Sequence, residues 1–324
     1  VGGTLRFGLP ITDEISFSPR YSVYNQYVSI PNDTKRPYND CTNPIFGRTP
    51  GFDYFALAGI GPSLFYNCLT NGEASLAIKE SQGSRLTSLA GYTLSYNSLD
   101  RIKEPTSGIY AELKQDIAGL GGQSRFVRTT GEARYYHDLF WDDIIGIARI
   151  QGGVMQAIGG YQLHVTDNFN LGPSLVRGFA PGGIGPRDIS DFTNTKGNGI
   201  GGTKYLGGSL EAQFPIWGLP RELGLKGAVF ADAGTLFDYR GRTNFSQQVF
   251  GVAGLPCVPP YTPPNFGQGS CIVLDDEKKI RSSVGASILW ASPLGPIRFD
   301  YAIATSKAKN DVTQAFRFSG GSSF

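Results

Sequence analysis

Charged side chains are scarce in this sequence: lysine, arginine, aspartate and glutamate make up 17% of 324 residues, against about 25% in typical soluble domains. Long apolar runs are also absent, because no stretch approaches the ~18 consecutive apolar residues of a membrane-spanning helix. A helical membrane protein is therefore excluded. The 29 basic and 27 acidic residues are spread along the chain, so no basic arm indicates a nucleic-acid partner.

Histidine is scarce too, with two residues in the whole chain. A barrel hydrolase or protease needs a histidine beside a serine or aspartate. His137 precedes Asp138 in the motif YYHDLFWDD and is interpreted as part of an interfacial turn, whereas His164 is interpreted as a solvated loop residue. No glycine-rich phosphate loop follows a strand in a βα pattern. The sequence therefore predicts neither an enzyme nor a bound cofactor.

The four cysteines fall two by two into long predicted connections, Cys41 with Cys68 and Cys257 with Cys271. Neither pair has the CxxC spacing of a metal site, so no metal is expected. Four cysteines allow three pairings, and pairing within each connection is the simplest. Closing the segment from Cys257 to Cys271 contributes about 3 kcal/mol in the chain-entropy model.

What the sequence does contain is a period of two. Apolar residues recur at every second position in eleven segments of about 8 to 16 residues. In the segment 206–214, Leu206, Leu210 and Phe214 share one face, while Glu211 and Gln213 lie on the other. The pattern predicts β-strands with one apolar and one polar face.

The lengths of strands and connections decide which solvent covers the apolar face. Strands of ~9–11 residues cross a bilayer when tilted, whereas strands of globular proteins have ~5–6 residues. Long connections are expected at 31–83, 159–203 and 239–280, and tight turns at 11–14, 100–107, 217–222 and 292–295. Long loops on one rim and short turns on the other are typical of outer-membrane barrels. The sequence predicts an all-β, transmembrane antiparallel β-barrel; a soluble all-β protein with long loops is the alternative.

Glycine is abundant, with 44 residues against a usual share of ~7%. Gly207, Gly227 and Gly285 are predicted to face the lumen, where a missing side chain lets an inserted loop approach the wall. Eleven strands leave the chain ends on opposite rims, while single-chain bacterial barrels have an even number of strands. With Val1 in place of an initiator methionine, we expect residues 1–324 to be the C-terminal portion of a barrel, cut from a longer chain whose N-terminal strands are absent here or supplied by a partner.

The connection 159–203 contains the motif LVRGFAPGGIGPRD, in which Val176, Arg177, Gly178 and Phe179 are followed by small and stiff residues. Such a loop can fold back into a wide lumen. A guanidinium in a partly desolvated place needs a carboxylate partner. The next two strands offer Asp232 as the main partner of Arg177, with Glu211 close by.

Two further expectations concern this loop. Phe179 is expected to pack against lumen neighbours such as Phe230. The alternative to the whole arrangement is that Arg177 is a solvated loop residue and that both acids merely coat a pore wall.

The last segment alternates in the same way: Phe316 and Phe318 point outward, Gly320 and Gly321 follow, and Phe324 closes the chain. The apolar band is thin here, which favours local thinning of a bilayer. Paired glycines also weaken the hydrogen-bonded ladder. The alternative is a plain barrel-closing strand.

Four stretches of this sequence resemble the BamA family of outer-membrane assembly barrels: VRGF at 176–179, FADAG at 230–234, WASPLGPIRFDYA at 290–302 and FRFSGGSSF at 316–324. The resemblance runs from about Gly3 to Phe324 and implies a sixteen-stranded barrel with a lumen-inserted VRGF loop that docks through Arg177, Asp232 and Glu211. Counterparts of the family's first five strands and of its periplasmic POTRA domains are missing from this sequence.

The resemblance also implies a function. Such a barrel folds and inserts β-barrel proteins into the outer membrane of a Gram-negative bacterium, by templating client strands at a weak lateral seam beside the final strand. The implied partners are unfolded outer-membrane clients, outer-membrane lipids and accessory lipoproteins.

Other functions remain alternatives at this point. A TamA-like insertase or a two-partner secretion pore shares the VRGF-type loop. A passive porin needs an open charged constriction, in which arginines face acids (Arg128, Arg134 and Arg149 facing Glu112 and Asp116). A surface-binding module would use its disulfide-bearing loops.

Overall fold

The computed structural model describes residues 1–29, 32–33, 36–37, 74–102, 104–140, 144–190, 196–245, 271–292 and 295–320, and the account below concerns these residues. Nearly all regular structure in them is antiparallel β-sheet. One short α-helix, α2 (Leu76–Glu80), and one 3₁₀ turn, η2 (Arg221–Leu223), interrupt it. No helix in the described ranges is long and apolar enough to cross a membrane.

One large sheet dominates the described part of the chain, and its strands follow one another mostly in sequence order. β2 (Leu9–Pro10) pairs with β3 next to β1, so an interrupted strand forms the first hairpin. The path runs through eleven strands, which is the number that the alternation predicts: β1 (Gly2–Arg6), β3 (Ile15–Val28), β6 (Gly83–Asn97), β7 (Gly108–Gly122), β8 (Phe126–Phe140), β9 (Ile144–Ala157), β12 (Lys204–Pro215), β13 (Leu225–Phe237), β15 (Arg281–Ser292), β16 (Gly295–Ser306) and β17 (Phe316–Gly320).

Two small sheets lie in the connections. β10 (Arg187–Asp188) pairs with β11 (Asn198–Gly199) and with β14 (Leu274–Asp275), which joins the connection after β9 to the one after β13. β4 (Asn32–Asp33) pairs with β5 (Arg36–Pro37).

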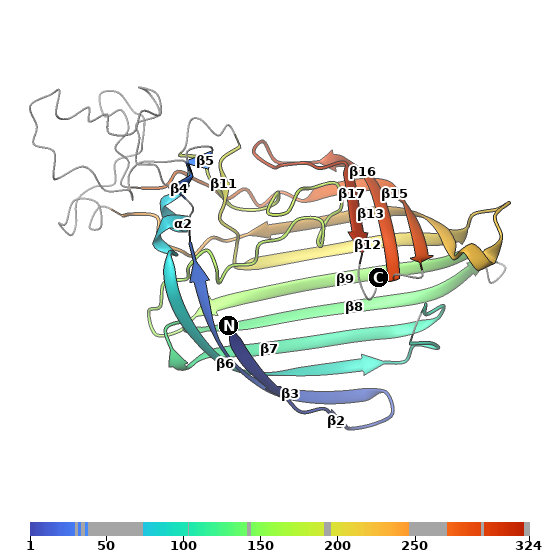
Figure 1. Cartoon of the computed structure of the whole chain (residues 1–324), viewed down its shortest axis with the longest axis horizontal. Coiled ribbons are helices and arrows are strands. Elements are labelled where there is room, and N and C mark those ends of the chain that lie inside the picture. Colours follow the sequence, from blue (N-terminus) through green and yellow to red (C-terminus); the bar gives the residue numbers. More distant parts are fainter. Residues whose placement is uncertain are drawn as a thin grey trace, which may run out of the picture.

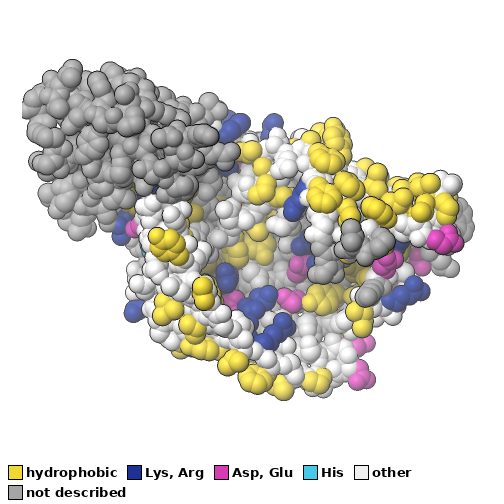
Figure 2. All heavy atoms as spheres, in the orientation of Figure 1, with side chains coloured by type: hydrophobic (Ala, Val, Ile, Leu, Met, Phe, Trp, Pro, Cys, Tyr) yellow, Lys and Arg dark blue, Asp and Glu magenta, His cyan; other side chains and the backbone are white. Residues whose placement is uncertain are grey.

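The large sheet is strongly curved (Figure 1), and its two faces differ in chemistry. On β12, Leu206 and Leu210 are exposed while Gly207 is buried. Figure 2 shows lysine, arginine, aspartate and glutamate side chains gathered in the hollow and hydrophobic side chains along the outer side. The predicted alternation is therefore confirmed, with the apolar face turned outward and the polar face turned to the concave side.

The strand ends also define two rims. Tight connections join β2 to β3, β6 to β7, β12 to β13 and β15 to β16 on one rim, where the sequence predicts them. The long connections 29–82, 158–203 and 238–280 leave from the other rim. That second rim also carries two short connections, 123–125 between β7 and β8 and 307–315 between β16 and β17.

The 158–203 connection folds back over the concave side of the sheet, where it forms a buried apolar cluster. Leu175, Val176, Phe179 and Ile184 pack there against Leu236 of β13. A barrel filled by its own loop in this way buries apolar surface on both partners. The connection thus covers the concave face of the sheet (the wall) at the place where the polar residues of β12 and β13 lie side by side.

Glycines allow this close approach at two positions of the wall. A Cβ at Gly207 would collide with the side chain of Leu175, and one at Gly234 would lie 2.8 Å from its Cγ. Gly285 similarly leaves room for the ring of Phe230. The prediction for Gly227 was wrong: it shares the outward face with Phe214, whose ring covers it, because only even-numbered residues of β13 point to the concave side.

Candidate functional site

The site is built around Arg177, which the 158–203 connection carries onto the concave wall. The chain turns at Gly178, whose φ of +88° favours glycine. A Cβ at this position would also lie 3.1 Å from the Cβ of Ala302 on β16. The glycine therefore lets the loop lie flat against the wall and directs the preceding arginine toward β12 and β13.

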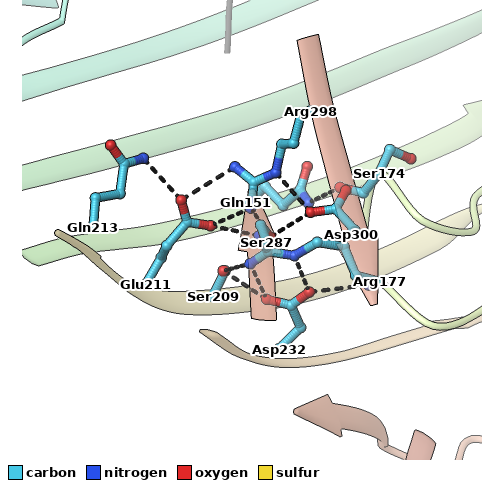
Figure 3. A network of polar contacts seen from close by, with 10 residues as sticks. All are labelled: Gln151, Ser174, Arg177, Ser209, Glu211, Gln213, Asp232, Ser287, Arg298 and Asp300. Carbon is cyan, nitrogen blue, oxygen red and sulfur yellow. Dashed lines mark hydrogen bonds and ion pairs between the residues drawn. The ribbon is translucent and has the colours of Figure 1, made fainter. Parts of the chain in front are cut away.

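Arg177 and Asp232 form a bidentate pair (Figure 3). Nε of Arg177 donates to Oδ2 of Asp232 at 2.7 Å, and Nη2 donates to Oδ1 at 2.7 Å. The backbone N–H of Arg177 donates to the same carboxylate at 3.0 Å. Both side chains are largely buried, at 13% and 3% exposure. The arrangement matches the planar fork of a guanidinium and fixes both the loop backbone and the side chain.

Glu211 on β12 completes the loop's anchorage. It accepts a hydrogen bond from Nη1 of Arg177 at 2.5 Å, and Ser209 accepts one from Nη2 at 2.9 Å. Ser209 in turn donates to Oδ1 of Asp232 at 2.6 Å. The structure thus brings together the three residues that the sequence singles out, Arg177, Asp232 and Glu211, on one patch of the wall.

A second arginine, Arg298 on β16, shares this patch. It donates to Glu211 through Nη2 at 2.8 Å and through Nη1 at 3.1 Å, and to Asp300 through Nε at 2.7 Å. Ser287 on β15 links the two, since it accepts from Arg298 and donates to Asp300. Two guanidinium groups and three carboxylates therefore form one network across β12, β13, β15 and β16.

Sequence reasoning missed Arg298, Asp300, Ser209 and Ser287 as members of the site. The alternation places Arg298 and Asp300 on the polar face of their strand, which was the available signal. The curvature of the sheet brings β16 opposite β12 and so places Arg298 within hydrogen-bonding distance of Glu211. Alternation along a single strand carries no information about this distance between strands.

Phe230 and Phe179 are arranged differently from the prediction. The guanidinium carbon of Arg177 lies 3.5 Å from the centre of the Phe230 ring, a cation–π contact. Phe179 instead belongs to the apolar cluster of Leu175 and Ile184. The predicted packing of Phe179 on Phe230 was wrong because the arginine occupies the face of that ring.

The docked loop also contacts the segment that leads into β17. The backbone of Phe179 forms a β-bridge with Thr313, and Gln314 donates its N–H to the carbonyl oxygen of Gly178 at 2.9 Å. Ala180 donates to the carbonyl oxygen of Val312 at 2.9 Å. The VRGF motif is therefore bonded on one side to the wall and on the other to the connection before the last strand.

Comparison with known proteins identifies the family. A family profile described as the Omp85 superfamily domain matches residues 1–324. The chain belongs to the Omp85 superfamily. All-β architecture with antiparallel strands and a filled concave face is consistent with this membership.

Among relatives of this Omp85 chain is an outer membrane protein assembly factor BamA of Neorickettsia risticii, 29% identical over 80% of the chain and 30% of that protein. BamA of Neisseria meningitidis is 27% identical over 70% of the chain and 28% of that protein. The human sorting and assembly machinery component 50 homolog is 26% identical over 79% of the chain and 50% of that protein. The chain spans about 30% of the length of the BamA relatives.

The fold agrees with a solved structure. BamA from Haemophilus ducreyi lacking POTRA domains 1–3 matches the whole chain with a TM-score of 0.64 at 20% identity, and the match covers 54% of that protein. The Omp85 chain therefore has the fold of part of a BamA barrel.

The final strand of the Omp85 chain, β17, pairs with β16 over five residues, from Phe316 to Gly320. Phe316 and Phe318 are exposed at 57% and 59%, as the alternation predicts. Gly320 is the last described residue, and Gly321 and Phe324 lie outside the described residues. Within the described sheet, β17 and β1 are the two edges.

Other charges on the concave face are paired. Arg128 and Arg20 both contact Asp116, which is buried. Arg134 and Arg149 both contact Glu132, at 2.5 and 3.1 Å. Glu112 contacts Lys114 at 3.5 Å rather than an arginine. The arginines proposed for a porin constriction are therefore held against the wall by neighbouring acids.

Both histidines, His137 and His164, lie in the part of the chain that the structure describes. His164 was predicted to be solvated, and this was wrong: it is half-buried near Tyr161, and burial lowers its pKa to about 4, with a smaller contribution from Arg85. Burial also raises the pKa of Tyr161 to about 12. His137 was predicted to lie in a turn, and this was wrong: it lies within β8, opposite Gly146 of β9, where it is exposed and stacks on Tyr135.

Cys271 is buried at the start of the described segment 271–292. Cys41, Cys68 and Cys257 lie outside the described residues, so the predicted pairings stay predictions. Over the described ranges, no cluster of three potential metal ligands occurs.

Proposed function

We propose that this chain is the C-terminal portion of a barrel subunit that folds and inserts β-barrel proteins into the outer membrane of a Gram-negative bacterium. The observation that carries the proposal is the buried pairing of Arg177 with Asp232 and Glu211 in an Omp85 chain. Relatives named as assembly factors support the same assignment. The proposed role is non-enzymatic and needs no cofactor, because strand pairing and burial of apolar surface in the client supply the free energy for its folding and insertion.

In the proposed mechanism, the client strand is paired and inserted at a lateral seam beside β17. In a complete sixteen-stranded barrel this strand would meet the first strand of the barrel. The paired glycines Gly320 and Gly321 would weaken its hydrogen-bonded ladder to β16. A client strand would add to the exposed edge by β-augmentation, in which backbone hydrogen bonds give affinity without requiring one sequence.

The VRGF loop would hold this seam in register. It is bonded to the wall through Arg177 and to the 307–315 connection through Gly178 and Phe179. Because that connection leads directly into β17, undocking the loop would release the start of the last strand. Docking would therefore hold the start of β17 in place.

Phe316 and Phe318 would face lipid at the seam, followed by the small residues Gly320 and Ser322. A thin apolar band lowers the cost of local bilayer thinning and so of client insertion. Unfolded outer-membrane proteins are the proposed clients, with outer-membrane lipids and accessory lipoproteins as partners. Disulfides between Cys41 and Cys68 and between Cys257 and Cys271 would close the loops of the outward rim.

The test uses the intact parent chain in lipid vesicles and measures the folding rate of an added client barrel. Wild type is expected to accelerate client folding. Arg177→Ala and Asp232→Asn are each expected to reduce the acceleration by about tenfold, because each strands a buried charge at the docking site. Arg134→Ala is the matched control, since this arginine lies on the same face but 34% exposed and outside the loop contacts.

Single-channel conductance recorded on the same vesicles separates the alternatives. Large steady conductance without client folding would indicate a passive pore, and translocation of one dedicated substrate without folding of others would indicate a secretion pore. Client folding that survives both substitutions would contradict the role of the docked loop.

A further inference from the structure

The tight connection between β12 and β13, residues 216–224, extends beyond the ends of the neighbouring strands (Figure 1) and carries large apolar side chains. Trp217 is 72% exposed, and Leu219 and Leu223 are exposed as well. A Cβ at Gly218 would meet nothing within 4 Å. This segment, called the apolar turn below, therefore presents three large apolar side chains to its surroundings.

Other turns of the same rim have a different composition. The β2–β3 turn contains the acidic pair Asp13 and Glu14. The β6–β7 turn, residues 98–107, contains four charged residues (Asp100, Arg101, Lys103 and Glu104). Charged turns favour water, whereas exposed aromatic and aliphatic side chains in one turn favour an apolar or interfacial surrounding. The apolar content is thus a feature of this turn and not of the whole rim.

Trp217 joins the apolar turn to the outward face of the sheet. Its ring stacks on that of Phe214, with 5.7 Å between the ring centres and 10° between the ring planes. Phe214 lies on the outward face, where its ring covers Gly227. Figure 2 shows hydrophobic side chains continuing along the outer side toward this end of the molecule. The apolar surface of the turn is therefore continuous with the face of the barrel that contacts lipid.

The backbone of the apolar turn satisfies much of its own hydrogen-bonding need. The N–H of Leu219 donates to the carbonyl oxygen of Ile216 at 3.2 Å, and that of Leu223 donates to the carbonyl oxygen of Pro220 at 3.2 Å. The carbonyl oxygen of Gly224 accepts a hydrogen bond from a backbone N–H of β15 at 2.9 Å. Unpaired backbone groups are costly where water is scarce, so these bonds lower the cost of moving the turn out of bulk water.

We propose that the apolar turn inserts into the interface of the leaflet on its side of the membrane and anchors β12 and β13 there. The indole of Trp217 has an apolar ring and one N–H donor, a combination that favours the level of the lipid headgroups. The anchor would fix the depth of the two strands that carry Glu211 and Asp232. The inference rests on the barrel's outward face contacting lipid and not on the folding of clients.

Tryptophan fluorescence of the intact parent chain tests the proposal, in phosphatidylcholine vesicles whose acyl chains carry bromine close to the headgroup. The difference in emission between the parent chain and Trp217→Phe isolates the signal of Trp217. This signal is expected to be blue-shifted, and bromine should quench it about twofold relative to unbrominated vesicles. Trp290→Phe gives the same difference for an exposed tryptophan on the outward face of β15 and is the positive control.

Arg101→Trp is the matched negative control on the same rim. It places an indole in the charged β6–β7 turn, which an ion pair of 2.6 Å between Glu104 and Lys226 holds toward the concave side. Its added signal should not be quenched by bromine. A Trp217 signal that is quenched no more than this one would overturn the proposal and place the apolar turn in water or against a protein partner. Because client folding is not measured, normal quenching in a chain that folds no client would overturn only the proposed function.

Discussion

Arg177 in the 158–203 connection and Arg298 on β16 bind the same carboxylate, that of Glu211. Each arginine also has a second acid of its own, Asp232 for Arg177 and Asp300 for Arg298. The patch therefore holds three negative and two positive groups. Glu211 joins the loop's anchor to the strand next to β17.

This charge count predicts that Glu211→Gln destabilises the docked loop less than Arg177→Ala does. The glutamine variant keeps one carboxylate for each arginine, whereas the alanine variant leaves the Asp232 carboxylate buried without its guanidinium. We expect a loss of about 3–5 kcal/mol in local stability for Arg177→Ala and about 1 kcal/mol for Glu211→Gln. Hydrogen exchange of residues 172–186 measures both; a larger loss in the glutamine variant would contradict the charge argument.

Gly207 and Gly208 are neighbours on β12 that face opposite sides of the sheet. A Cβ at Gly207 collides with Leu175 of the docked loop, whereas one at Gly208 meets only the carbonyl oxygen of Arg149, at 3.4 Å. Gly207→Ala is therefore expected to cost about 1–3 kcal/mol by overpacking and to expose the loop to protease. Gly208→Ala should leave the cleavage rate of the loop unchanged, and equal effects would show that the alanine acts on the strand itself.

The connection before β17 is held by a buried ion pair. Arg281 donates to Asp311 through Nε at 3.0 Å and through Nη2 at 3.2 Å, and both side chains are almost inaccessible to solvent. Asp311→Asn removes the negative charge and is expected to cost about 3–5 kcal/mol. Faster hydrogen exchange in β17 is the expected readout.

Lys309→Gln changes an exposed residue of the same connection and serves as the control for the Asp311 variant. Unchanged exchange in β17 after Asp311→Asn would mean that the last strand is held independently of its connection.

His164 makes the base of the 158–203 connection sensitive to pH. Its pKa is lowered to about 4 from an ordinary value of 6.5, so the folded state binds its proton less readily than the unfolded state. The neutral ring of His164 therefore makes its full contribution to folding stability above pH 6.5, and this contribution is lost as the pH falls toward about 4. Protease cleavage near residues 158–170 should accelerate across that window. His164→Gln should flatten this dependence, while His137→Gln, at an exposed site, should preserve it.

Much of the site could be read from the sequence because alternation fixes which residues share a face. Glu211 and Asp232 lie on the concave face as predicted, and Phe316 and Phe318 lie on the outward face. The prediction that Gly227 faces the concave side was wrong because the alternation of β13 was assigned one residue out of phase at that position. Alternation is a property of one strand, so it cannot report that Arg298 reaches Glu211 across the hollow.

Composition and period by themselves determined the antiparallel all-β class, the path of eleven strands, and the rim from which the long connections leave, since each follows from local backbone geometry. The tertiary structure alone decided which side chains meet. Sheet curvature joins Arg177 and Arg298 at one carboxylate, the docked loop places the arginine rather than Phe179 on the ring of Phe230, and burial among distant residues lowers the pKa of His164. These contacts depend on distances between strands far apart in the chain, which the order of residues along any one strand does not encode.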